Sequence, residues 1–238
     1  MKSFLLFVSI LIGIGSADTN VKTYTSEARN LKNNKLIYNE FHEERFTGGK
    51  IEVSITKYKD LNNNLISERV MNFGDDLTKP NFKLEDFTSG YIEGAEVVAK
   101  NKVKVFTRKD AKSKMEEEVL TVDDPYVIDG GLTYFFIKHW DNLMKGKTEE
   151  FNFITPSKLD YFRFRVYKDS ITTIGGRQGM RLILEPGSFI LRAFVDPIII
   201  VYALDNKGIL YYKGISNVND ENGKSYSVEI NYTENYGQ

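Results

Sequence analysis

Hydrophobic and polar residues alternate along much of the chain with a period of two. In residues 50–58 (KIEVSITKY), Ile51, Val53 and Ile55 are separated by polar residues. Successive side chains of a β-strand point to opposite faces of the sheet, so this period is typical of a strand with one buried face. The dominant pattern therefore predicts a mainly β protein.

Short polar segments rich in Gly, Asn and Asp separate the alternating stretches and predict tight turns. Consecutive strands joined by tight turns pair antiparallel, because parallel strands need long crossover connections. We expect strands at residues 35–45, 50–58, 65–73, a pair within 91–110, then 115–122, 150–155, 159–168, 180–185, 198–204, 209–215 and 226–232. Residues 74–89, rich in Asp, Lys and Pro, are expected to form a long connection.

One segment, residues 126–146, instead has the periodicity of a helix. Its apolar residues cover more than half of the circumference, whereas a helix that lies on a surface has a smaller apolar arc. We therefore expect a helix over residues 131–145 that is enclosed on most of its surface by a strongly curved sheet. Asp129 is expected to cap its N-terminus, and Trp140, inside the apolar arc, is expected to be substantially buried.

The predicted fold is mainly β: a single curved antiparallel sheet or half-barrel wrapped around this one amphipathic helix. We assign this single β domain to residues 35–238 and regard residues 18–34 as an N-terminal extension. The helix would then plug the concave face of the sheet. The pattern leaves open whether it fills the concavity or leaves room for a ligand.

Residues 1–17 have the composition of a signal peptide. Lys2 precedes an apolar run, and Gly15 and Ala17 are the small residues that a signal peptidase requires. The run is shorter than the roughly 20 apolar residues that cross a bilayer. We therefore expect cleavage after Ala17, export to the bacterial periplasm, and no transmembrane segment in the mature chain.

The amino-acid composition excludes several classes of chemistry and of partner. The chain has no cysteine, which excludes disulfides, thiol catalysis and a cysteine-linked lipid anchor. Lys and Arg total 32 against 33 Asp and Glu, so there is no electrostatic footprint for nucleic acid. No partner of that kind is expected.

No motif for catalysis or for a cofactor is apparent. The two histidines, His42 on an expected edge strand and His139 on the helix, lack the spacing of metal ligands. Acidic clusters occur at residues 75–76, 116–118 and 123–124, and paired acids can hydrolyse glycosides. A carboxylate-dependent hydrolase is thus an alternative that we rank last. We expect a non-catalytic protein without metal or cofactor.

Residues 159–168 (LDYFRFRVYK) place aromatic and cationic side chains on one strand face, formed by Tyr161, Arg163, Arg165 and Tyr167. That face is either a solvated outer surface or the wall of a ligand groove. In a groove, aromatic rings suit acyl chains and guanidinium groups suit an anionic head. These four residues, with Phe136 and Trp140 of the helix, are the candidate ligand-binding residues.

Residues 187–200 form the longest apolar stretch after the signal peptide, interrupted by Asp196 and Pro197. They are either a buried strand that enters a turn or, where exposed, a patch that faces lipid or a partner protein. An exposed patch would favour an alternative function, that of a structural or interaction protein in cell-envelope assembly.

Several stretches resemble an uncharacterised group of bacterial periplasmic proteins, a domain-of-unknown-function family of curved antiparallel sheets. They are YFFIKHWDNLMKGKTEEFNF, LDYFRFRVY, LRAFVDPIIIVYAL and LYYKGISNVNDENGKSYSVEI. Such proteins are similar in architecture to the lipoprotein-carrier superfamily, in which a curled sheet wraps around a helix and leaves an apolar cavity. The resemblance implies a fold and a compartment, and no catalytic residues. We therefore expect a periplasmic protein that binds or carries a lipid or other amphiphile.

Overall fold

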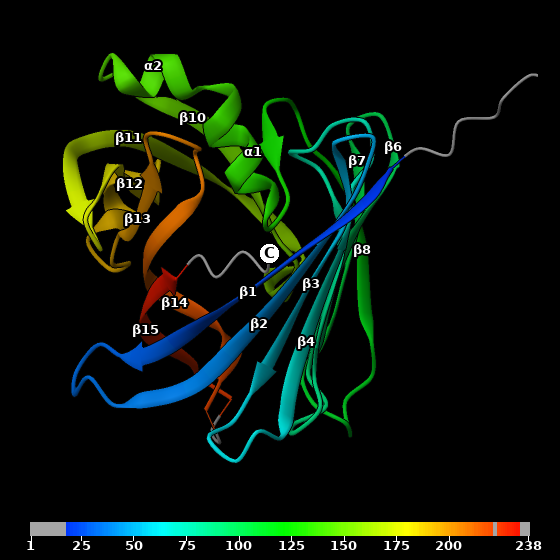
Figure 1. Ribbon diagram of the computed structural model, residues 1–238. Coiled ribbons are helices and arrows are strands. Elements are labelled where there is room, and N and C mark those ends of the chain that lie inside the picture. Colours follow the sequence, from blue (N-terminus) through cyan, green and yellow to red (C-terminus); the bar gives the residue numbers. More distant parts are fainter. Residues whose placement is uncertain (1–17, 221–222, 234–238) are drawn as a thin grey trace, which may run out of the picture.

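The computed structural model describes residues 18–220 and 223–233. The predicted signal peptide lies outside the described residues. Fifteen strands form one continuous sheet, which curves strongly without closing into a barrel (Figure 1). The expectation of a mainly β protein built from a single curved sheet is confirmed.

The order of the strands places the first and the last strand of the chain side by side in the middle of the sheet. From β1 the chain passes outward through a meander to β8, and from β15 the order runs back through the other half to β9. Strands β8 and β9, close together in sequence, are therefore the two edges. Neighbouring strands pair antiparallel, except that β9 and β10 pair parallel.

The first half of the sheet contains β1 (Thr19–Asn30), β2 (Leu36–Thr47), β3 (Lys50–Lys59), β4 (Leu65–Asn72), β5 (Asn81–Asp86), β6 (Ile92–Ala99), β7 (Lys102–Arg108) and β8 (Glu116–Thr121). The second half contains β9 (Tyr126–Val127), β10 (Glu149–Thr155), β11 (Asp160–Ile174), β12 (Arg177–Pro186), β13 (Ile198–Ala203), β14 (Ile209–Asn219) and β15 (Ser225–Thr233). The helices are α1 (Gly131–Lys138), α2 (Trp140–Met144), the 3₁₀ turn η1 (Pro156–Lys158) and α3 (Phe189–Arg192). None of the helices in the described part of the chain has the length and apolar character to cross a membrane.

Three strands lie where none was expected, namely β1, β5 and the two-residue β9. Strand β5 occupies part of the segment 74–89 that we expected to be a connection, although Phe82 and Leu84 alternate with polar residues and are buried. Residues 18–34, expected to be an extension, contain β1, which pairs with β2 and β15. The structure corrects that boundary. Residues 19–30 show no alternation of apolar and polar residues, because β1 is almost entirely polar and buries only Ser26 and Ala28.

The predicted helix is present as two short helices, α1 and α2, separated at His139. Phe135 and Phe136 of α1 and Trp140 and Leu143 of α2 are buried, and Trp140 is 8% exposed. The predicted burial of this tryptophan is confirmed.

The expected cap is wrong. The N-cap is Gly130, with no side-chain hydrogen bond. Asp129 has a left-handed backbone conformation, with φ of 40°, and its carboxylate pairs with Arg69 instead. Aspartate tolerates a positive φ better than most residues. Here its side chain forms an ion pair inside the curved sheet and does not cap the helix.

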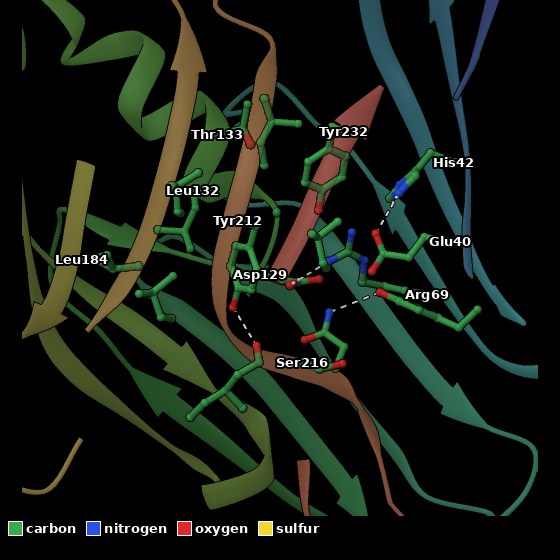
Figure 2. A pocket seen from close by; sticks show the side chains of 18 of the residues that line it. Glu40, His42, Arg69, Asp129, Leu132, Thr133, Leu184, Tyr212, Ser216 and Tyr232 are labelled. Atoms are coloured by element: carbon green, nitrogen blue, oxygen red, sulfur yellow. Dashed lines mark hydrogen bonds and ion pairs between the residues drawn. The ribbon is translucent and has the colours of Figure 1, made fainter. Parts of the chain in front are cut away.

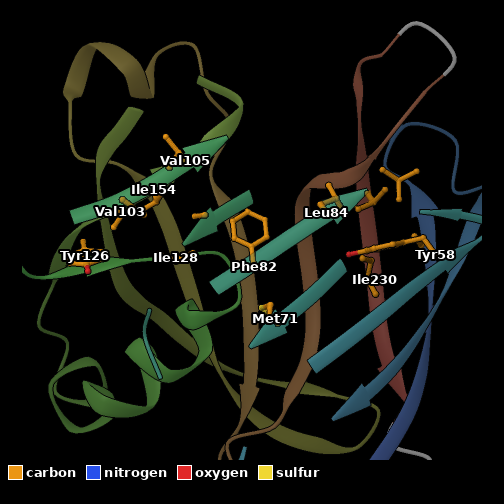
Figure 3. Close-up of a cluster of buried hydrophobic side chains, with 14 of the residues drawn as sticks. Tyr58, Met71, Phe82, Leu84, Val103, Val105, Tyr126, Ile128, Ile154 and Ile230 are labelled. Carbon is orange, nitrogen blue, oxygen red and sulfur yellow. The ribbon is translucent and has the colours of Figure 1, made fainter. Parts of the chain in front are cut away.

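Three hydrophobic clusters are present among the described residues, and the two larger ones contain most of the core. The first lies mainly on β2 to β7 and includes Tyr58, Phe82, Val105 and Ile154 (Figure 3). The second packs the buried side chains of α1 and α2 against β10 to β13. The helix pair is thus packed on one half of the sheet, and its N-terminal end reaches toward the other half (Figure 1).

Candidate functional site

The two halves of the sheet and the start of α1 together line a cavity of about 290 Å³ (Figure 2). Strands β2, β3 and β4 contribute from one half, and β10 and β12 to β15 from the other. The helix therefore does not fill the space that the sheet encloses.

One part of the cavity wall is apolar. It consists of side chains from α1, β10, β12, β13 and β14, namely Leu132, Phe153, Leu184, Ile198, Ile200 and Ile209. These strands bury alternate residues against the helix pair, and the wall is the continuation of that buried face. It offers a surface for an apolar group.

The opposite part is polar, and the register of the sheet explains why. Tyr24, His42, Thr56 and Arg69 lie directly opposite one another on four adjacent strands, β1 to β4. Side chains at such positions lie on the same face of the sheet. Four polar residues, each unremarkable in its own strand, thereby form one row.

Hydrogen bonds connect this row to Glu40, the neighbour of His42 on the same strand face. Glu40 Oε2 lies 3.0 Å from His42 Nε2 and accepts a hydrogen bond of 2.7 Å from Ser26 Oγ. His42 Nδ1 lies 3.2 Å from Thr56 Oγ1. The imidazole also stacks on the ring of Tyr24, with centroids 4.3 Å apart. The imidazole is thus held at both nitrogens and on the ring face that stacks on Tyr24.

The geometry is not that of a hydrolytic triad. Ser26 and Glu40 contact the same imidazole nitrogen, whereas a triad needs nucleophile and carboxylate on opposite nitrogens. Thr56, at the other nitrogen, is completely buried and inaccessible to a substrate. The hydrogen bonds instead hold the imidazole of His42 and the carboxylate of Glu40 in fixed positions.

Arg69 and Asp129 complete the polar end. Arg69 Nη1 lies 3.3 Å from Asp129 Oδ1, and Arg69 Nη2 donates to Thr56 Oγ1 at 3.3 Å. Arg69 Nε and Asp129 Oδ2 are also buried, but neither has a hydrogen-bond partner among the described residues. A buried polar atom without a partner costs about 1–3 kcal/mol. Both residues line the cavity, so its polar end contains one donor and one acceptor that lack a partner in the protein.

The protonation states of the buried side chains determine the net charge at the polar end of the cavity. Burial alone would raise the pKa of Glu40, but hydrogen bonds from His42 and Ser26, together with the electrostatic attraction of His42 and Arg69, outweigh it and lower the pKa of this carboxyl. Burial raises the pKa of Tyr232, which is neutral. One guanidinium, that of Arg69, thus faces two carboxylates, those of Glu40 and Asp129. The polar end has no excess of positive charge.

A second cavity of about 770 Å³ adjoins the first. The two share Asp129, Phe153 and the β14 residues 215–217 in their walls. The larger cavity is also lined by Glu93. Burial, together with the negative charge of Asp129, raises the pKa of Glu93 to about 7, despite a hydrogen bond from Tyr91. This carboxyl therefore gains or loses its proton near neutral pH.

The candidate ligand-binding residues predicted from the sequence lie elsewhere. Phe136 and Trp140 are part of the second core cluster, and Tyr161 packs against the first. Arg163 pairs with Glu150, and Arg165 pairs with Glu185 and lies over the ring of Tyr167. None of the six lines either cavity. Their role in binding stays a prediction without support from these cavities.

The polar end was missed by sequence reasoning. His42 was expected on an edge strand, which is wrong, because β2 lies between β1 and β3. The available signal was the pair Glu40 and His42, polar residues at the positions where a half-buried strand should be apolar. His139 has a simpler role, since its Nδ1 pairs with Glu149 Oε2 at 3.0 Å.

The acidic clusters are in part held in ion pairs. Asp76 and Asp124 both pair with Lys79, at 3.1 and 2.6 Å. Among the described residues, no group of three or more His, Asp or Glu side chains is arranged to hold a metal ion.

Comparison with known proteins bears on the fold. No protein-family model matches the chain, and no curated protein sequence matches it. Among solved structures, the chain is similar to a β-barrel-like protein of the domain of unknown function DUF1849 from Brucella abortus. The two share 9% sequence identity with a TM-score of 0.54, over 90% of this chain and 98% of that one. At such low identity the likeness concerns the fold alone, that of an uncharacterised, curved β protein.

Proposed function

We propose that this protein binds a lipid or another amphiphile inside the curved sheet, without catalysing a reaction on it. The polar head would contact Arg69 and Asp129, and the apolar part would lie along the wall that includes Leu184. The observation that carries the proposal is the combination, in one cavity, of an apolar wall with an unfilled donor and acceptor.

The size of the space supports a small-molecule ligand. Ligand sites in proteins commonly measure about 300–1,000 Å³, and the adjoining cavities of about 290 and 770 Å³ match that range. Each methylene group that leaves water contributes about 0.8 kcal/mol. An acyl chain therefore gains most of its binding free energy from a dry apolar wall.

The polar end favours a neutral head group with a hydroxyl. A hydroxyl can accept a hydrogen bond from Arg69 Nε and donate one to Asp129 Oδ2, whereas an ionised carboxylate can only accept. Glu40 and Asp129 would also repel a carboxylate. This argument changes the sequence-based expectation of an anionic head group, which rested on Arg163 and Arg165.

The test is a titration with a fluorescent monoacylglycerol and with a fatty acid of equal chain length that carries the same fluorophore. We expect saturable binding of the monoacylglycerol and about tenfold weaker binding of the fatty acid. Equal affinities would overturn the assignment of the head group. Absence of saturation with both probes would overturn the proposal.

A variant that fills the smaller cavity tests whether the fluorescent monoacylglycerol binds there. Leu184→Trp should weaken binding of the monoacylglycerol at least tenfold, because the indole occupies the space along the apolar wall. Leu61→Trp is the matched control, since Leu61 is 60% exposed in a turn and lines neither cavity. Ile198→Phe is a second wall variant for use if Leu184→Trp does not fold, as judged by circular dichroism.

We also propose that the protein acts in the periplasm. The support is the signal-peptide pattern of residues 1–17. Sequencing of the N-terminus of protein recovered from the periplasmic fraction tests it, with Asp18 as the expected first residue. Recovery of chains that begin at Met1 from the cytoplasm would contradict it.

A further inference from the structure

The connection between β12 and β13 exposes a set of large apolar side chains. Phe189 and Phe194 are 81% and 83% exposed, and Ile190 is 71% exposed. Leu191 and Val195 are also exposed. We call residues 189–195 the apolar tip. Soluble proteins expose single apolar side chains routinely, but five within seven residues indicate a contact surface.

The conformation of the apolar tip is held by its polar groups, which point back to the sheet. Arg192 Nη1 donates to the carbonyl oxygens of Pro186 and Gly187, at 3.1 and 2.9 Å, and Arg192 Nε lies 3.8 Å from Glu185. Ser188 Oγ accepts from the backbone N–H of Leu191 at 3.5 Å. Polar groups thus face the protein and apolar groups face outward, the reverse of the usual arrangement at a soluble surface.

The apolar tip lies next to the cavities. It joins two strands whose residues Leu184 and Ile198 both line the smaller cavity. Ile199 pairs with Lys213, and continuing this register by two residues would place Pro197, which follows the tip, opposite Ile215. Ile215 is 51% exposed and lines both cavities. The tip therefore ends only a few residues before the cavity wall, which begins again at Ile198.

We propose that the apolar tip inserts into the surface of a lipid bilayer, which brings the exposed Ile215 side chain of the cavity wall toward the membrane. Insertion itself stands on the exposure and geometry of the tip. Its role in delivering or collecting an amphiphile rests on the proposed function.

Area and charge favour a bilayer over a protein as the occupant. The exposed part of the five side chains amounts to on the order of 500 Å², whereas a stable protein interface buries about 800 Å² on each partner. Arg192 is engaged by Glu185 and two carbonyl groups. The tip therefore offers little positive charge to an anionic surface, and apolar burial would drive its insertion.

The first experiment is flotation of the mature protein with phosphatidylcholine vesicles. We expect wild-type protein to float with them, and Phe189→Ser/Phe194→Ser to lose at least 90% of that association. Phe87→Ser is the matched control, because Phe87 is 50% exposed but lies in the turn after β5. Absence of flotation by wild-type protein, or equal flotation of the double variant, would overturn the proposal.

A spectroscopic experiment locates the insertion. Phe194→Trp adds a reporter, while the buried Trp140 supplies a constant background. On addition of vesicles we expect a blue shift in emission and quenching by lipids brominated along the acyl chain. An emission spectrum that vesicles leave unchanged would overturn insertion. Sedimentation without vesicles tests the other occupant, a second copy: self-association of wild-type protein that the double variant abolishes would replace the bilayer.

The two proposals fail separately. Titration of the Phe189→Ser/Phe194→Ser variant with the fluorescent monoacylglycerol should give wild-type affinity, because neither phenylalanine lines a cavity. Normal monoacylglycerol binding by wild-type protein that does not float would overturn insertion alone. Flotation without saturable binding would overturn the cavity proposal alone.

Discussion

Arg69 and Asp129 form an ion pair that joins the middle of β4 to the segment just before α1, with 3.3 Å between Nη1 and Oδ1. The side chains are each 17% exposed, and both also carry a buried atom without a hydrogen-bond partner among the described residues. Such a pair is costly, because desolvation of both charges offsets much of their attraction. Because the pair lies in the cavity wall, we propose that it serves binding rather than stability.

The energetics of this pair can be tested with a double-mutant cycle. Asp129→Asn should destabilise the protein by about 3 kcal/mol, because Arg69 is left buried without its counter-charge. Asparagine is the suitable replacement, since it tolerates the positive φ of this position. Arg69→Met in the same chain should restore part of the loss. Urea unfolding measures the two single variants, Asp129→Asn and Arg69→Met, and the double variant.

Additive effects of the two substitutions would contradict this account, since they would mean that the two side chains do not interact in the folded protein.

Most of the fold could be predicted because the strands obey a simple rule. The β3 segment, with its strict alternation, was located from the sequence nearly to the residue. Strand β1 could not be found, because its stability comes from pairing with two neighbours and not from an apolar face of its own. Pairing of β1 with β15 joins the two ends of the chain, and no local pattern encodes such a contact.

The candidate site was also hard to predict, because it too depends on contacts between strands that no local sequence pattern encodes. Glu40, His42 and Arg69 come from two strands, and only the register brings them into one cluster. Arg163 and Arg165 attracted attention because they are adjacent in sequence to aromatic residues. In the structure their charges are paired with nearby glutamates on the sheet surface. Sequence neighbourhood was a poor guide to a site built from several strands.

The tryptophan in α2 should be a sensitive reporter of the second core. Trp140 is buried among side chains of the helix pair and the sheet, and Lys207 Nζ lies 5.3 Å from its ring centroid. Trp140→Ala should destabilise the protein by about 3–5 kcal/mol, the range for loss of a large aromatic side chain from a core. Denaturant unfolding followed by circular dichroism measures this loss. A native emission maximum as red as that of free tryptophan in water would contradict its burial.

A glycine at the start of α1 is required by close packing. A Cβ atom on Gly131 would lie 2.2 Å from the carbonyl oxygen of Thr78, which belongs to the backbone and cannot move away cheaply. Helix propensity alone would favour alanine here by about 1 kcal/mol, but overpacking costs about 1–3 kcal/mol. We expect Gly131→Ala to lower the stability by about 1–2 kcal/mol.

Gly74→Ala serves as the control for that substitution, because nothing lies within 4 Å of a Cβ at Gly74. It should leave the thermal midpoint essentially unchanged. If Gly131→Ala raised the midpoint, the segment around Thr78 would have to be more adaptable than its contacts indicate.

Glu93 should make the stability depend on pH. Burial raises its pKa from 4.5 to about 7 in the folded protein. The folded state therefore holds the proton more tightly than the unfolded state. The resulting stabilisation is fully present below pH 4.5 and is lost as the pH rises to about 7. The loss amounts to at most about 3 kcal/mol, and less where solvent reaches the carboxyl.

Glu93→Gln keeps the shape and removes the titration, so its stability relative to wild-type protein should increase between pH 5 and pH 8. Thermal or urea unfolding at both values measures the difference. Glu96→Gln, an exposed position on the same strand, is the matched control and should follow the wild-type profile. A Glu93→Gln variant that loses stability in parallel with wild-type protein from pH 5 to pH 8 would show that another group controls this range.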